Sequence, residues 1–222
     1  MKFSTILTTD QRKVLSALQD RDRHERQSQS SDPLRLKAVT QTVAQFLHLT
    51  ILQKSARTIV EFGTSHGYST IYLAAAAVQT GGCVLSVDQM PEKTKFASEN
   101  LRAAGLDHIV ELHTTDGTDF ARLLPTAIDF VFVDYGIPAF APAFEILKTK
   151  LSLGGFLFVD GWSRPECWET EVEWRSFKEH LEKEPTFLSC TFPLEKEHLI
   201  AVKLGDSRSI TKNLGALGNA SA

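Results

Sequence analysis

The sequence predicts an α/β fold with a seven-stranded sheet, and three observations support this. From residue 58 onward, short apolar runs alternate with amphipathic helical runs. The run at 128–136, IDFVFVDYG, is apolar on both faces, as a central parallel strand must be. The last two runs, 186–193 and 198–204, are separated by only four residues, so they must pair antiparallel. The expected sheet is Rossmann-like, mostly parallel with a C-terminal antiparallel hairpin, and carries helices on both faces.

Two helices are expected before the first strand. The first covers 9–27, with a polar cap and three leucine or valine side chains on one face. The second should follow Pro33, because Leu36, Val39 and Val43 continue with helical spacing. Residues 1–33 are therefore predicted to be a helical extension of the main domain.

The repeating elements follow from residue 58 to residue 185. Strands are expected at 58–63, 83–88, 109–116, 128–136 and 156–162, and helices at 68–80, 91–106, 120–124, 139–155 and 169–185. We expect one domain over 34–205, followed by a disordered tail at 206–222, which is small and polar.

Composition limits the class of partner. The 222 residues include 24 basic and 27 acidic side chains, a net charge of −3, which gives no electrostatic reason to expect nucleic acid or an anionic membrane. A small-molecule partner is favoured. Three cysteines without paired spacing indicate a reducing setting, and no apolar run is long enough for a membrane span, so a cytoplasmic protein is expected.

A glycine turn follows the first expected strand. Gly63 and Gly67 flank Ser65 at a strand-to-helix junction, where free backbone amides can meet a ligand. The spacing is GxxxG and not the GxGxxG of dinucleotide enzymes, which favours a ligand with fewer phosphates. Glu61 precedes the turn, and its carboxylate would attract a cationic ligand. A tight turn with no ligand role is the alternative.

Two further acids end the next strands. Asp88 stands 25 residues after Gly63, where an acid can bind both hydroxyls of a ribose. Asp116 and Gly117 follow the third strand, where an acid can accept from an adenine amine and a glycine leaves room for the ring. Together these signals indicate an adenosine-containing ligand, although an Asp-Gly pair alone is equally typical of a simple turn.

The chain resembles the class I S-adenosylmethionine-dependent methyltransferases, specifically the small-molecule O-methyltransferases that include catechol and caffeoyl-CoA enzymes. The resemblance is carried by EFGTSHGYST, SVD, DFVFVD, LSLGGFLFVD and the terminal hairpin, and it covers about residues 34–204. It implies that S-adenosylmethionine is the cofactor. By this resemblance the cofactor-binding residues would be Glu61, Gly63, Ser65, Gly67, Ser69, Asp88, Asp116, Gly117 and Asp134.

The same resemblance implies a divalent cation held at the ends of the fourth and fifth strands. The family has an aspartate at the first place and an Asp-Asn pair at the second, whereas this chain has Asp134 and then Asp160-Gly161. The usual lysine base is replaced by Ile137. Two carboxylates with water can still hold Mg²⁺, so a weakened magnesium site at Asp134 and Asp160 and a metal-free site both stay open.

In a metal-free site, Asp134 would orient the substrate or the cofactor and Tyr135 would hydrogen-bond the acceptor, as candidate catalytic residues. Trp162, Trp168 and Trp174 are candidates for the wall of an acceptor pocket. The expected reaction is methyl transfer to a small-molecule hydroxyl, and the resemblance implies a homodimer built through the N-terminal helices. A non-catalytic S-adenosylmethionine-binding protein, a nitrogen or carbon acceptor, and a nicotinamide oxidoreductase are the alternatives.

Overall fold

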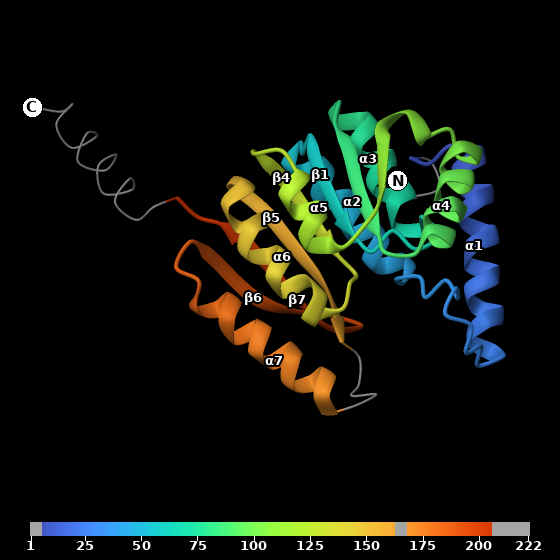
Figure 1. The fold of residues 1–222 in the computed structure, drawn as a ribbon. Helices are drawn as coiled ribbons and strands as arrows, with labels where there is room; N and C mark the ends of the chain where they lie inside the picture. Colours follow the sequence, from blue (N-terminus) through green and yellow to red (C-terminus); the bar gives the residue numbers. More distant parts are fainter. Residues whose placement is uncertain (1–5, 163–167, 206–222) are drawn as a thin grey trace, which may run out of the picture.

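The computed structural model describes residues 6–162 and 168–205. Seven strands form one sheet in the order β3-β2-β1-β4-β5-β7-β6 (Figure 1). The strands are β1 Thr58–Phe62, β2 Cys83–Asp88, β3 Val110–Thr114, β4 Ile128–Val133, β5 Leu151–Trp162, β6 Phe187–Leu194 and β7 Lys196–Lys203. The predicted Rossmann-like sheet with its antiparallel end is confirmed.

β1 lies in the middle of the parallel part of the sheet. It pairs with β2 on one side, with Glu61 opposite Ser86, and with β4 on the other, with Phe62 opposite Val133. All of β4 except Asp129 is buried, which explains why its sequence is apolar on both faces. The carboxyl ends of β1, β2 and β4 therefore reach the same edge of the sheet.

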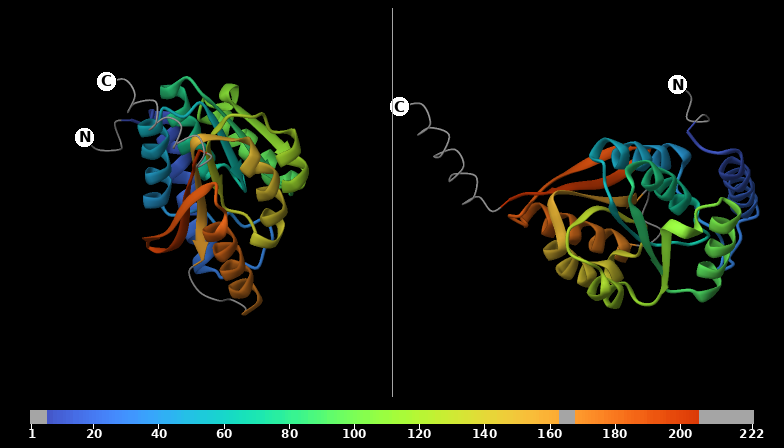
Figure 2. Two further views of the ribbon diagram at one scale, coloured as in Figure 1. Left: turned by 90° about the vertical axis from the view of Figure 1, so that its left-hand side faces the viewer. Right: turned by 90° about the horizontal axis from the view of Figure 1, so that it is seen from above.

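Helices cover both faces of the sheet, as Figure 2 shows. The helices are α1 Thr9–Gln27, α2 Gln41–Lys54, α3 Tyr68–Thr80, α4 Pro91–Ala103, α5 Gly117–Leu123, α6 Ile137–Lys150 and α7 Trp168–Lys183. The first four pack on one face, around an apolar cluster that includes Leu47, Ile71 and Phe158. The last three pack on the opposite face, around Phe140, Phe144 and Leu157. The two clusters place the sheet at the centre of the domain.

The second helix begins later than the sequence predicts. α2 starts at Gln41, after Thr40, whose hydroxyl accepts from the amide of Val43. Lys37 has a positive φ of 47°, which ends any helix begun at Pro33. Leu36 is buried nevertheless, because its amide is bonded to Glu25 of α1 and its carbonyl to Ser65 after β1. Leu36 therefore stands at helical spacing from the apolar residues that follow it and is buried, although its own segment is not a helix.

The end of the chain follows the predicted hairpin. β6 pairs antiparallel with β7, with Glu195 alone between them at a φ of 68°. β5 begins at Leu151, earlier than expected, so the glycines at 154 and 155 belong to the strand and not to the preceding helix. The predicted tail at 206–222 lies outside the described residues.

No helix in the described part of the chain is both long and apolar enough to cross a bilayer.

Candidate functional site

The strand ends bring the predicted residues to one edge of the sheet. Gly63 follows β1, Asp88 ends β2, Asp134 follows β4 and Asp160 lies near the end of β5. Adjacent parallel pairing of these strands sets the four positions side by side. Open parallel sheets bind ligands at this carboxyl edge, so the arrangement is that of a ligand site.

Contacts within the chain already require a glycine at the start of this turn. Gly63 has a φ of 103°, and a Cβ at this position would overlap the carbonyl oxygen of Asp134. Its amide donates to the carbonyl of Val87 at 2.9 Å. Gly67 has a φ of 86° and caps the start of α3. The turn therefore locks β1, β2 and β4 together, and its contact with a ligand stays a prediction.

Glu61 lies beneath this turn and is fully buried. Its carboxylate accepts from the hydroxyls of Ser69, Thr70 and Ser86, each at 2.6 Å. Burial raises the pKa of Glu61 to about 7, against the lowering effect of the three hydroxyls. In this arrangement Glu61 and Ser69 support the start of α3 from below, and their expected contact with a cofactor stays a prediction.

Asp88 is held by two backbone amides. One carboxylate oxygen accepts from the amide of Ser65 at 2.8 Å, and the other accepts from the amide of Met90 at 2.9 Å. The Ser65 hydroxyl donates to the carbonyl of Leu36 at 2.8 Å. These bonds fix the direction of the carboxylate and tie the turn to segment 31–40, while each carboxylate oxygen keeps capacity for a further donor.

Asp116 and Gly117 begin α5. The Asp116 carboxylate accepts from the amide of Thr118 at 2.7 Å, and this bond is the main cause that lowers the pKa of Asp116. The Tyr135 ring lies 3.3 Å from the place of a Cβ on Gly117, and burial raises the pKa of Tyr135 to about 12. Tyr135 thus points toward Gly117, while Asp134 lines the cavity together with Asp160.

Asp134 lies at the floor of a cavity of about 590 Å³. The Asp134 side chain is accessible to solvent through the cavity, although many protein atoms lie around it. Desolvation raises the pKa of Asp134 to about 7, and the neighbouring Asp160 carboxylate adds to the rise, while the positive charge of Lys196 opposes it. The floor also includes Asp160 and Lys196, and segment 22–40 forms the wall.

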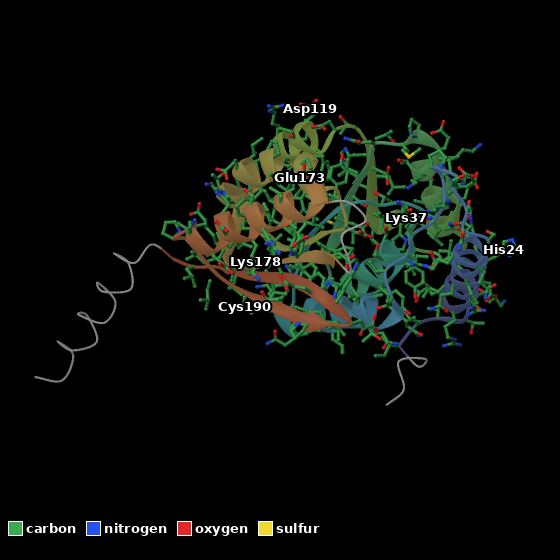
Figure 3. The ribbon with its side chains drawn as sticks, turned by 90° about the horizontal axis from the view of Figure 1, so that it is seen from below. His24, Lys37, Asp119, Glu173, Lys178 and Cys190 are labelled. Atoms are coloured by element: carbon green, nitrogen blue, oxygen red, sulfur yellow. The ribbon has the colours of Figure 1, made fainter. Side chains whose placement is uncertain are left out.

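The wall is held by side chains of α1. The amide of Leu36 donates to Glu25 at 2.7 Å, and the amide of Ala38 donates to Asp22 at 3.1 Å. Lys37, labelled in Figure 3, belongs to this wall. Segment 22–40 therefore closes one side of the cavity. That the N-terminal helices cover the substrate side stays a prediction.

A β-bulge shapes the end of β5. Val159 pairs with Leu199 and Trp162 pairs with Glu197, so Asp160 and Gly161 together oppose His198. The Asp160 carboxylate lies 2.5 Å from the ammonium of Lys196. Sequence reasoning missed Lys196 and His198, which lie in and beside a short charged turn. The available signal was the antiparallel pairing itself, because the start of β7 must lie beside the end of β5.

The donor set here does not fit a divalent cation. Among the described residues no group of three His, Cys, Asp or Glu side chains has the arrangement of a metal site. The expected asparagine is Gly161, where a Cβ would overlap the Glu197 carbonyl oxygen. Asp160 already has a cationic partner in Lys196.

Of the three tryptophans predicted to line an acceptor pocket, Trp174 is the one whose side chain the structure describes. Trp174 packs in the apolar cluster under α6 and α7, so it does not line the cavity, which corrects the expectation from sequence. The side chains of Trp162 and Trp168 lie outside the described part of the structure.

Comparisons with known proteins agree with this geometry. A family model described as a methyltransferase domain matches residues 60–162. A catechol O-methyltransferase of Niastella koreensis is 30% identical over 129 residues, which are 55% of this chain and 56% of the relative. A ribosomal RNA small subunit methyltransferase G of Rhodopseudomonas palustris is 35% identical over 92 residues, 41% of this chain and 40% of the relative. The chain thus spans about half the length of the curated relatives that it matches.

Two solved structures extend the match to most of the fold. An O-methyltransferase of Bacillus cereus in complex with S-adenosylhomocysteine has a TM-score of 0.74 at 22% identity, covering 87% of this chain and 91% of that one. An O-methyltransferase of Streptomyces achromogenes, involved in tomaymycin synthesis and solved with S-adenosylmethionine, has a TM-score of 0.71 at 25% identity, covering 85% and 90%.

Proposed function

Because this chain belongs to the class I S-adenosylmethionine-dependent methyltransferases, in the group like the catechol and caffeoyl-CoA O-methyltransferases, we propose that it methylates a hydroxyl oxygen of a small molecule. The observation that carries the proposal is the alignment of Gly63, Asp88 and Asp134 on one edge of the sheet, beside a cavity large enough for a small acceptor.

The residues present fit S-adenosylmethionine, which when bound supplies a methyl group on a cationic sulfur. The turn from Gly63 to Gly67 would hold the methionine end. Asp88 would accept hydrogen bonds from the ribose hydroxyls, because each of its carboxylate oxygens accepts from one backbone amide and can accept from one more donor. Asp116 and Gly117 would border the adenine, with Tyr135 beside them as part of the cofactor site instead of the acceptor site.

The acceptor would enter the cavity above Asp134. Methyl transfer by direct displacement depends mainly on positioning and on exclusion of water. The wall made by segment 22–40 supports both, because its backbone is bonded to α1 and to Ser65 of the glycine turn. Asp134 would orient the acceptor from the floor of the cavity.

A calorimetric titration with S-adenosylmethionine tests the proposal. We expect micromolar binding by the wild type and a loss of about 100-fold in Asp88→Ala, because two charge-assisted hydrogen bonds are worth about 3 kcal/mol together. Asp107→Ala, a half-exposed acid near β3, is the control and should bind like the wild type. The absence of binding by the wild type would overturn the proposal.

Turnover separates the enzyme from a non-catalytic binding protein. Formation of S-adenosylhomocysteine with a panel of catechols and other phenols is the expected result. The similarity to a ribosomal RNA small subunit methyltransferase makes small-subunit ribosomal RNA a useful comparison substrate, although the net charge of −3 gives little attraction for RNA. The predicted homodimer is tested separately by light scattering.

A further inference from the structure

A lysine lies where the family resemblance implies a metal ion. The ammonium of Lys196 is 2.5 Å from Oδ2 of Asp160, and the two side chains are 25% and 6% exposed. Lys196 is the first residue of β7 and borders the same cavity as Asp134. Its positive charge also opposes the rise in the pKa of Asp134. One ammonium therefore acts on both carboxylates at the end of β4 and β5.

His198 does not share this task. Its Nδ1 accepts from the amide of Gly161 at 2.8 Å, and its Nε2 donates to the carbonyl of Leu194 at 2.7 Å. The ring is therefore neutral, with its proton on Nε2. It cannot donate to Oδ1 of Asp160, which lies 3.3 Å from Nδ1 and has no hydrogen-bond partner in the described structure. Lys196 thus supplies the positive charge that compensates Asp160.

The bulge also closes the place of a third ligand. Gly161 faces the backbone of β7 so closely that any side chain there would overlap the carbonyl oxygen of Glu197. The same register brings the start of β7, and with it Lys196, to the end of β5. Loss of one ligand and gain of a cation are therefore consequences of one backbone arrangement.

We propose that the Lys196 ammonium takes the place of the divalent cation and binds the acceptor oxygen during methyl transfer. This inference rests on the proposed function. Since an ammonium favours a neighbouring oxyanion, the acceptor would be a hydroxyl that ionises readily, such as a phenol. The acceptor hydroxyl gives its proton to water, its oxygen forms the bond to the methyl carbon, and the electron pair of the broken carbon–sulfur bond stays on sulfur. Lys196 remains an ammonium throughout.

Electron paramagnetic resonance with Mn²⁺ tests the proposal without an acceptor. Mn²⁺ takes oxygen ligands much as Mg²⁺ does, and its free and bound forms differ in signal. With S-adenosylmethionine present, we expect the wild type to leave the free-ion signal unchanged. Lys196→Met should bind Mn²⁺ at least about tenfold more tightly, because it leaves two carboxylates without a counter-charge. Lys178→Met is the control, since Lys178 pairs with Glu197 at 3.1 Å, is 28% exposed and is labelled in Figure 3.

Two results of this experiment would contradict the proposal. Mn²⁺ binding by the wild type would overturn the proposal, and so would a Lys196→Met protein that stays as silent as the control. Lys196→Gln, checked by circular dichroism, serves if the methionine variant does not fold.

Turnover of a phenol, where found, should resist EDTA and fall about 100-fold in Lys196→Met. The calorimetric affinity for S-adenosylmethionine should be unchanged in that variant. A failure of the proposed function would instead appear as absent cofactor binding in the wild type, with the metal result unaffected.

Discussion

The two halves of the candidate site are built in different ways. The proposed cofactor half, formed by the glycine turn with Glu61 and Asp88, satisfies its polar groups through backbone amides and buried hydroxyls that come from neighbouring strands and α3. The proposed acceptor half, formed by Asp134, Asp160 and Lys196, joins charged side chains across the sheet and is walled by segment 22–40. The first half depends on backbone geometry, and the second depends on which distant segments pack beside it.

The largest effect is expected at the glycine turn. Gly63→Ala should lower the free energy of unfolding by about 4 kcal/mol, because it combines a strained φ of 103° with an overlap on the Asp134 carbonyl. Urea unfolding measures this. Gly136→Ala is the matched control two residues beyond Asp134, since nothing lies within 4 Å of its Cβ position. A loss below about 1 kcal/mol in Gly63→Ala would contradict the picture of a rigid cofactor half.

A second prediction uses the buried acid beneath the turn. The pKa of Glu61 is raised from 4.5 to about 7, so the folded protein binds the proton more tightly than the unfolded chain. The stability contributed by protonated Glu61 is fully present below pH 4.5 and is lost as the pH rises through 7. Glu61→Gln keeps nearly the same shape and removes this titration, and its amide nitrogen donates where one carboxylate oxygen accepts from hydroxyls. The stability offset from that exchange does not depend on pH.

The measurement is the difference in unfolding free energy between the wild type and Glu61→Gln across pH. The wild type should lose about 2 kcal/mol relative to the variant between pH 5 and pH 8. A constant difference over that range would show that Glu61 is already ionised in the folded protein and that burial does not raise its pKa.

The smallest effect is expected in the wall of the acceptor half. Glu25→Gln weakens the bond from the Leu36 amide and the ion pair with Arg21, at a cost of about 1 kcal/mol. Hydrogen exchange at Leu36 should become faster, while affinity for S-adenosylmethionine stays the same. Asp20→Asn, whose exposed carboxylate pairs with Arg23, is the control on the same helix. An equal loss in both variants would mean that the wall is not held by Glu25.

Several parts of the fold were predictable because the signal is local. The alternation of apolar runs, the glycines at 63 and 67, and the four-residue gap in the hairpin each reflect contacts within a few residues or a required backbone conformation. The start of α2 was predicted wrongly, because burial of Leu36 against α1 produced helical spacing in an extended segment.

The sequence by itself determined the order of elements, the parallel sheet with its hairpin, and the positions of acids and glycines at strand ends, since each strand carries its own pattern of burial and its own turn. Only the tertiary structure decided that Glu61 is enclosed by hydroxyls, that Tyr135 turns toward Gly117, and that Lys196 meets Asp160. The last of these contacts depends on register and on a bulge between β5 and β7, which bring together residues 36 positions apart in the chain. A side chain's partner across such a pairing is set by backbone geometry, and no local pattern records it.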